Sequence, residues 1–268
     1  MAVRCDCAGG DRVARILARA RIPRRYEHCD FENFETDLQY EDAEATVWNR
    51  SLQQAKLVVE GFARDYPVGT DRGLLLMGPC GVGKTHLAVA ALKQLVLRGH
   101  EGLFYDYWQL LKEIQDSYNP ESQTTEMSVL EPVLTAELLL LDDLGASKPS
   151  AWALETVGLI LKTRYNEKRV TILTTHYLDS SPEQPNPVES SSGPAVPAGK
   201  DAPRPTFRQR QAVVSPSRDR VPIFRGETLA QRVGQHIRSR LYEMCRTIEI
   251  VAPDYREKVR QADRVRSS

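Results

Sequence analysis

The sequence predicts an α/β fold in which a parallel sheet is flanked by helices. Three observations predict it. A glycine-rich stretch lies between a short apolar run and a helical pattern, a second apolar run ends in two aspartates, and short apolar runs alternate with amphipathic segments along most of the chain. Continuous apolar runs are typical of strands buried on both faces, as parallel strands are. In such sheets ligands bind at the carboxyl ends of the strands.

The glycine-rich stretch 78–85 reads G-x-x-x-x-G-K-T, the pattern of a P-loop. The apolar run Leu74–Met77 precedes it and the helical pattern His86–Arg98 follows it. Its glycines allow backbone N–H groups to surround an anion at the helix N-terminus. Lys84 would reach the β- and γ-phosphates of ATP, and Thr85 would ligate Mg²⁺. The residues expected to line the nucleotide are Gly78, Pro79, Cys80, Gly81, Val82, Gly83, Lys84, Thr85 and His86.

The composition fits a cytoplasmic globular protein. At 268 residues with 41% hydrophobic content, the chain has room for one large domain or two small ones. It has neither the apolar run of about 18 residues that a membrane span needs nor the apolar core of a signal peptide. Five scattered cysteines fit a reducing compartment better than a disulfide framework.

The charges are unevenly distributed, although the formal net charge is zero. Residues 1–25 carry seven arginines against two aspartates, and residues 204–268 carry 14 arginines and one lysine against seven acidic residues. Basic ends on an acidic body suggest a polyanionic partner such as DNA. Solvated helix faces and tails produce the same pattern, and the charges alone do not separate the two explanations.

The N-terminal segment contains Cys5 and Cys7, which are separated by one residue. A zinc ion needs four ligands, and the nearest further candidates are His28 and Cys29. A basic helix predicted over Asp11–Ala20 separates the two pairs. We therefore expect no bound zinc in this chain.

A pocket for the nucleotide base is expected just before the first strand, because the phosphates lie at the end of that strand. Ile22, Tyr26 and Phe31 are the candidates for its walls. The same residues would serve as plain core, and the sequence leaves both interpretations open. A helix is predicted next, over Asp37–Tyr66, because its apolar residues recur at helical spacing.

The apolar run Leu138–Leu141 is followed by Asp142 and Asp143, which is a Walker B pattern. It predicts a buried strand that presents two carboxylates at the sheet edge where the P-loop lies. Asp142 would hold Mg²⁺ through water, and Asp143 would orient or deprotonate the attacking water.

The remaining elements continue the alternation of strands and helices. They are a strand over Leu103–Asp106, helices over Tyr107–Tyr118, Met127–Ala136 and Ser150–Lys168, and a strand over Val170–His176. Arg164 lies near the C-terminal end of its helix, where positive charge is favourable. Thr175 and His176 would lie beside the Walker B acids and sense the γ-phosphate, with ordinary polarity at a strand end as the alternative.

The pattern divides the chain into a basic N-terminal segment (1–36), an ATPase core (37–179 and 226–252), an insertion (180–225) and a charged C-terminal tail (253–268). The insertion is rich in proline and serine and poor in large apolar groups, which predicts disorder. A helix over Glu227–Cys245 and a strand over Thr247–Val251 are expected to complete the core.

Together these segments resemble one family, the DnaC/IstB/DnaI-type AAA+ ATPases, which are bacterial helicase loaders and transposition helpers. The matching segments are Ile22–Tyr26 with Asn33–Phe34, Gly78–Leu87, Leu139–Gly145, Ile172–Tyr177 and Ser239–Met244. The resemblance implies a P-loop NTPase fold of the AAA+ type, with a five-stranded parallel sheet of order 5-1-4-3-2 and no separate lid domain. It also implies an ATP-dependent homo-oligomer, often on single-stranded DNA.

The resemblance also implies roles for three residues. Thr175 and His176 would stand at the sensor 1 position. Arg240 would act as an arginine finger on the nucleotide of a neighbouring subunit, and an exposed helix arginine is the alternative.

Several departures from the family pattern bear on function. Sensor 1 usually ends in Asn and here ends in His176, and His236 stands where members often carry a further arginine. Asp143 is shorter than the Glu of most AAA+ proteins, so slow hydrolysis is expected. The insertion is not typical. Many relatives have two N-terminal cysteine pairs in a zinc-binding module, and only Cys5 and Cys7 are present here. The sequence leaves open whether the start is truncated or the module is lost, and therefore whether this segment binds zinc or docks a helicase.

The function that the resemblance implies is that of an ATP-dependent, DNA-associated protein that helps to load a replicative helicase. One alternative is a transposition helper that selects target DNA for a transposase. The other is a nucleotide-binding adaptor with negligible turnover. The motifs do not separate these three.

Overall fold

The computed structural model describes residues 7–38, 43–68, 72–148, 150–179 and 227–257. Its centre is one five-stranded sheet of order β2-β3-β4-β1-β5, in which every neighbouring pair is parallel. The strands are β1 (Gly73–Met77), β2 (Gly102–Asp106), β3 (Leu138–Asp142), β4 (Val170–Thr175) and β5 (Cys245–Glu249). The order 5-1-4-3-2 implied by the resemblance is therefore confirmed.

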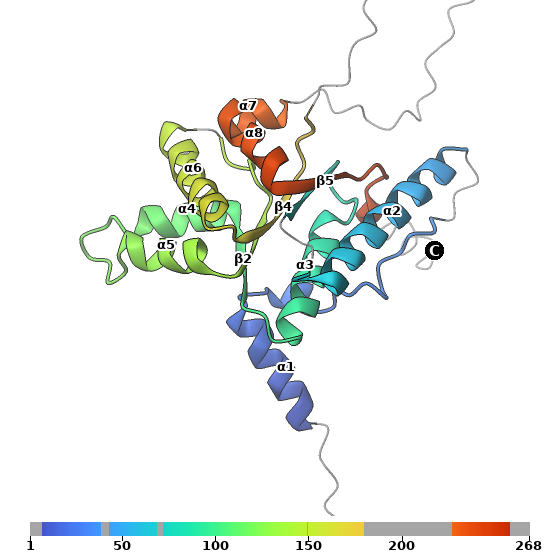
Figure 1. Cartoon of the computed structure of the whole chain (residues 1–268), viewed down its shortest axis with the longest axis horizontal. Helices are drawn as coiled ribbons and strands as arrows, with labels where there is room; N and C mark the ends of the chain where they lie inside the picture. Colours follow the sequence, from blue (N-terminus) through green and yellow to red (C-terminus); the bar gives the residue numbers. More distant parts are fainter. Residues whose placement is uncertain (1–6, 39–42, 69–71, 149, 180–226, 258–268) are drawn as a thin grey trace, which may run out of the picture.

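The helices cover both faces of the sheet, with α2 and α3 on one side and α4, α5 and α6 on the other (Figure 1). They are α1 (Cys7–Arg19), the 3₁₀ helix η1 (Arg24–Tyr26), α2 (Ala43–Asp65), α3 (Lys84–Leu97), α4 (Tyr107–Asp116), α5 (Glu126–Thr135), α6 (Ala151–Asn166), α7 (Leu229–Val233) and α8 (Gln235–Met244). Among the described residues, no helix has the length and apolar content that a bilayer span requires.

The apolar strands explain the two-sided core. Successive side chains on a strand point to opposite faces, so Leu74 and Leu76 pack with α2 and α3, while Leu75 and Met77 pack with α4 and α6. All five residues of β1 and of β3 are buried. The parallel register pairs Met77 with Thr175 and Asp106 with Asp142, so the polar carboxyl ends of the strands meet at one edge.

Three predicted boundaries were wrong, and local chemistry explains two of them. The helix expected over Glu227–Cys245 is divided by Gly234, whose φ of 85° is open to glycine and ends α7. The last strand begins at Cys245, two residues before the predicted start, because Cys245 pairs with Gly73 and its side chain enters the core. The helix expected from Asp37 begins at Ala43.

The predicted insertion 180–225 and most of the predicted tail lie outside the described residues. Within the tail, residues 255–257 form a helical turn. The predicted disorder of the insertion and the predicted course of the tail are therefore not tested by the described residues.

Arg164 of α6 is fully buried rather than placed at a solvent-exposed helix end. Its guanidinium donates to the carbonyl oxygens of Val133, Ala136 and Val170, at 2.9, 2.9 and 2.6 Å, and to the hydroxyl of Thr171 at 2.9 Å. Burial lowers the pKa of Arg164. The last carbonyls of a helix have no partner within the helix, so Arg164 ties the end of α5 to β4.

Replacing Arg164 with methionine is expected to lower the free energy of unfolding by about 3–5 kcal/mol, because it leaves buried carbonyl oxygens without donors. Chemical denaturation of the purified variant measures the change. Lys162→Met on the exposed side of the same helix is the matched control, expected within about 0.5 kcal/mol of the parent. A loss below about 1 kcal/mol for Arg164→Met contradicts this account of the buried guanidinium.

Candidate functional site

The glycine-rich loop lies between β1 and α3, as the sequence predicts. Gly81 and Gly83 have φ angles of 76° and 92°, a region that side chains other than glycine rarely adopt. Gly83 is the N-cap of α3. A Cβ on Gly83 would stand 2.5 Å from the ring of Phe34, and one on Gly81 would stand 1.7 Å from Oδ1 of Asp254. The loop therefore needs glycine for its conformation and for its close packing.

Lys84 opens α3 and is buried, with 6% of its surface exposed. Its Nζ donates hydrogen bonds to the carbonyl oxygens of Gly78 at 2.9 Å and of Pro79 at 2.7 Å. Burial is the main reason that the pKa of Lys84 lies below its ordinary value. The loop thus holds an ammonium group against neutral carbonyl oxygens, an arrangement in which an incoming phosphate would gain a strong charge-assisted partner.

Asp142 and Thr85 meet beside the loop, although 57 residues separate them. Thr85 Oγ1 donates to Asp142 Oδ1 at 2.9 Å, and Thr174 Oγ1 donates to the same oxygen at 2.6 Å. Asp142 is 1% exposed, and burial raises its pKa to about 6 despite these two hydrogen bonds. Carboxylate and hydroxyl oxygens are the ligands that Mg²⁺ takes beside a nucleotide, so the donor set fits that ion.

Thr174 is a site residue that the sequence analysis missed. Besides its bond to Asp142, its hydroxyl accepts from the backbone N–H of Asp143 at 2.9 Å. It thereby contacts the side chain of Asp142 and the backbone of Asp143. The sequence does contain one signal for this role. Successive residues of a strand point to opposite faces, so only one of Thr174 and Thr175 can face Asp142.

The two candidate sensor residues occupy different surroundings. Thr175 is buried, and its hydroxyl donates to the carbonyl oxygen of Leu144 at 2.8 Å, which ties β4 to the loop after β3. The ring of His176 lies 4.0 Å from that of Tyr177. Burial lowers the pKa of His176, while the charge of Asp143 opposes that shift. The downward shift of the pKa of His176 favours its neutral form.

Asp143 has a φ of 56°, a left-handed conformation that few non-glycine residues adopt. The strained backbone turns the chain away from β3 directly after Asp142. Strained residues cluster at functional sites, where the surrounding structure holds them in place.

The three residues proposed to wall a base pocket lie before α2. Ile22 and Phe31 are buried in the core that α2 and α3 form with the sheet, and the half-buried Tyr26 has its ring 5.9 Å from that of Phe104 on β2. Phe34, which the prediction did not name, lies closer to the loop: it contacts Gly83, and its ring is 5.3 Å from that of His86.

Arg240 lies on α8, and its guanidinium stands 5.7 Å from the ring centre of Tyr165 on α6. It is partly exposed. The structure thus places Arg240 on the helical surface of the molecule next to α6.

The chain after β5 returns to the phosphate loop, a feature that the sequence analysis missed. Ile250 N donates to the carbonyl oxygen of Met77 at 2.8 Å, and Tyr255 N donates to that of Gly81 at 3.2 Å. Asp254 lies between these contacts with its carboxylate beside Gly81. Its Oδ1 accepts from Arg256 N at 2.9 Å. Predicted as part of a tail, this segment packs against the loop.

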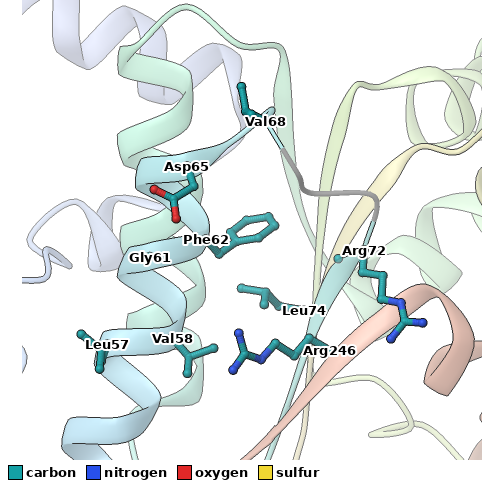
Figure 2. Close-up of a pocket in the computed structure, with 10 residues that line it drawn as sticks. Leu57, Val58, Gly61, Phe62, Asp65, Val68, Arg72, Leu74 and Arg246 are labelled. Carbon is teal, nitrogen blue, oxygen red and sulfur yellow. The ribbon is translucent and has the colours of Figure 1, made fainter.

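A cavity of about 820 Å³ lies away from this edge, between α2 and the amino ends of β1 and β5 (Figure 2). Leu57, Val58, Phe62 and Leu74 form apolar walls, and Arg72 and Arg246 supply positive charge. Gly73 begins β1 here, whereas the P-loop follows the last residue of β1. The cavity is therefore separate from the loop and its acids.

Replacing Asp142 with asparagine is expected to stabilise the metal-free protein. The folded carboxyl has a pKa of about 6 against an ordinary 3.8, so the folded state holds the proton more tightly than the unfolded chain. The associated stability is complete below pH 3.8 and is lost as the pH rises through 6. Asparagine mimics the neutral form, and the gain in unfolding free energy at pH 8 is roughly 3 kcal/mol.

Denaturation in the presence of a chelator at pH 8 and at pH 5 tests this expectation, since the gain should fall to about half at the lower pH. Asp116→Asn, on the exposed face of α4, is the control and should change little at either pH. If Asp142→Asn has a lower unfolding free energy than the parent at pH 8, the expected stabilisation is wrong.

Comparison with known proteins gives a consistent set of relatives. The model of the family described as "IstB-like ATP binding protein" matches residues 15–180. The replicative helicase loader DnaC of Escherichia coli (strain K12) is 26% identical over 165 residues, which cover 62% of this chain and 62% of the relative. The replicative helicase loader DnaI of Bacillus subtilis (strain 168) is 29% identical over 121 residues, 44% of this chain and 38% of the relative. The matched region thus spans less than two thirds of each relative.

Solved structures agree with the sequence relatives. The crystal structure of the DnaC helicase loader has a TM-score of 0.56 and 25% identity, and the match covers 85% of this chain and 100% of that one. The crystal structure of DnaI has a TM-score of 0.54, with 87% of this chain and 93% of that one covered, and at 22% identity it supports the fold alone.

Proposed function

Because the chain belongs to the IstB-like ATP binding protein family, we propose that it binds ATP with Mg²⁺, hydrolyses it slowly and acts on DNA as a helicase loader. The resemblance to the DnaC/IstB/DnaI-type proteins is confirmed by this membership. One observation carries the proposal: the buried ammonium of Lys84 lies in the phosphate loop, and the Thr85–Asp142 pair adjoins the same loop. A cation and oxygen ligands side by side suit a magnesium-bound triphosphate.

Each residue of the site has a chemical task in this proposal. The backbone N–H groups from Gly78 to Thr85 surround the phosphates, and Lys84 neutralises the β- and γ-phosphates. Thr85 and Asp142 hold Mg²⁺, which when bound neutralises charge that develops on the phosphate oxygens. Asp143 orients the attacking water. Its side chain is shorter than Glu, and this difference supports slow turnover.

Two further residues complete the proposed mechanism. His176 donates one hydrogen bond toward the γ-phosphate, a role that a neutral imidazole can perform. Arg240, partly exposed on α8, acts on the nucleotide of a neighbouring subunit, where its positive charge stabilises the transition state. ATP binding therefore favours a homo-oligomer, and hydrolysis switches it. We also propose a cytoplasmic location, because the matching relatives are replicative helicase loaders of Escherichia coli and Bacillus subtilis.

The partner is proposed from the relatives. The curated relatives with matching segments are replicative helicase loaders, so we expect a replicative DNA helicase to be the partner. The family model carries the IstB description, which favours a transposase as the second candidate. Affinity purification from the source cell with ATP present separates the two. Recovery of a helicase supports the loader, and recovery of a transposase in its place refutes it.

Single-stranded DNA is the proposed ligand of the oligomer, and Trp108 supports this. Trp108 is 56% exposed on α4, next to the strand edge that carries Asp106, and Lys112 Nζ lies 5.5 Å from the centre of its ring. An exposed aromatic ring beside a cation is suited to stacking a base and neutralising its phosphate.

Trp108→Ala is expected to weaken binding of a single-stranded oligonucleotide roughly 5- to 150-fold, since base stacking contributes about 1–3 kcal/mol. Fluorescence anisotropy with ATP and Mg²⁺ present measures the affinity. Leu159→Ala on α6 removes a side chain that is 49% exposed and serves as the control. An unchanged affinity for Trp108→Ala would exclude α4 from the DNA surface.

If the basic residues 204–240 contact phosphates, the affinity should also fall steeply with salt.

A further inference from the structure

Three potential metal ligands meet at the N-terminal end of α3. His28 and Cys29 lie in the loop after η1, and His86 lies in the first turn of α3. One ligand atom from each lies within 4.8 Å of the other two. His28 Nε2 is 4.0 Å from Cys29 Sγ, and the rings of His28 and His86 are 6.1 Å apart. Within the described ranges this is the one group of three such side chains.

The separations are close to those that a bound ion requires. Bond lengths of about 2.3 Å to sulfur and about 2.0–2.1 Å to nitrogen place tetrahedral ligand atoms roughly 3.4–3.6 Å apart. The spacing of 4.0 Å between His28 and Cys29 is within about half an ångström of that value. The largest separation within the group, up to 4.8 Å, has to shorten by roughly 1.2–1.4 Å for all three side chains to bind one ion.

The chemistry of His86 supplies a second observation. Its Nε2 lies 2.8 Å from the carbonyl oxygen of Asp30. A carbonyl oxygen accepts only, so Nε2 carries the proton and Nδ1 keeps the lone pair that a metal ion takes. Histidine ligands generally have this arrangement, in which a backbone carbonyl holds the other ring nitrogen and selects the tautomer.

The burial of the three residues defines what kind of site they form. Cys29 is 2% exposed, His86 is partly buried and His28 is exposed. Three side chains fill three of the four positions of a tetrahedral ion. Because His28 is exposed, the fourth position is open to water. Soft and borderline ligands of this kind select zinc-class ions over Mg²⁺, which prefers oxygen.

We propose that His28, Cys29 and His86 bind a thiophilic divalent metal ion of the zinc class, with the fourth position open. The ion links the segment before α2 to the helix turn that begins with Lys84 and Thr85. His28 and Cys29 were considered only with Cys5 and Cys7 in the sequence, because His86 lies 57 residues further along the chain.

The test is a cobalt titration of the full chain carrying Cys5→Ser and Cys7→Ser, which removes the other paired cysteines. We expect one Co²⁺ per chain, a thiolate-to-cobalt charge-transfer band in the near ultraviolet and visible bands of a four-coordinate ion. Adding Cys29→Ser should abolish the charge-transfer band. Adding His28→Ala should weaken the affinity at least tenfold, by analogy with the loss of supporting groups in known sites.

Cys245→Ala is the matched control, because Cys245 is also a buried thiol but packs in the other core cluster. It should keep the band. Thermal unfolding gives a second readout: Zn²⁺ should raise the Tm of the parent background and leave that of Cys29→Ser unchanged. The absence of a charge-transfer band, or a band that survives Cys29→Ser, overturns the proposal. Either result leaves nucleotide binding through Lys84 unaffected, so the two proposals fail separately.

Discussion

Replacing Lys84 with alanine is expected to weaken binding of both ATP and ADP by on the order of 10²-fold, because a charged partner of the phosphates is lost from a buried site. Lys84 is 6% exposed, and its ammonium already lies inside the loop, against the carbonyl oxygens of Gly78 and Pro79. Its electrostatic interaction with phosphate is therefore little screened by water. Isothermal titration calorimetry with each nucleotide and Mg²⁺ measures the effect.

Lys162→Ala is the control for Lys84→Ala, since Lys162 lies on the exposed side of α6. Its nucleotide affinity should equal that of the parent. Lys84→Met adds a further check, because it keeps the length of the side chain and fills the same space. Nucleotide uptake that is untouched in both Lys84 variants would refute nucleotide binding at this loop, and with it the proposed function.

Replacing Asp143 with asparagine is expected to lower the rate of ATP hydrolysis by about 10²–10⁴-fold, the usual contribution of a group that orients or deprotonates water. The affinity for ATP should change little, because Asp142 and Thr85, rather than Asp143, are the proposed magnesium ligands. A steady-state phosphate-release assay under saturating ATP gives the rate, and calorimetry gives the affinity.

The same variant separates an ATPase from an adaptor. A parent protein that turns ATP over no faster than Asp143→Asn, with binding intact in both, would identify a nucleotide-binding adaptor. Asp116→Asn on α4 controls for the loss of a surface charge and should hydrolyse ATP at the parental rate.

Local patterns predicted the sheet and the central motifs because those features are local. A run of four leucines followed by two aspartates is sufficient to predict a buried strand that ends in carboxylates, and β3 covers the four leucines and Asp142, with Asp143 directly after it. The P-loop spacing likewise predicted the start of the following helix to within two residues, since α3 begins at Lys84 rather than at His86. The order of the strands came from the family resemblance, since the pattern of a strand does not determine its neighbours.

Features that depend on contacts between distant segments were not predictable in this way. Arg164 reads as a helix-end cation, yet its donors are taken by carbonyls of α5 and β4. Phe34 and Asp254 lie far from the P-loop in sequence and reach it only in the fold. Thr174 differs from Thr175 by the side of β4 that it faces, and sequence alone does not say which side holds Asp142.

The packing of Phe34 on Gly83 and of Asp254 beside Gly81 joins both flanks of the core to one loop. The segment after β5 brings both signs of charge to this loop, because the carboxylate of Asp254 lies beside Gly81 and the positive charge of Arg256 acts on Lys84. A substitution in either flank therefore reaches the phosphate loop by direct contact, although both flanks lie outside the sequence motif.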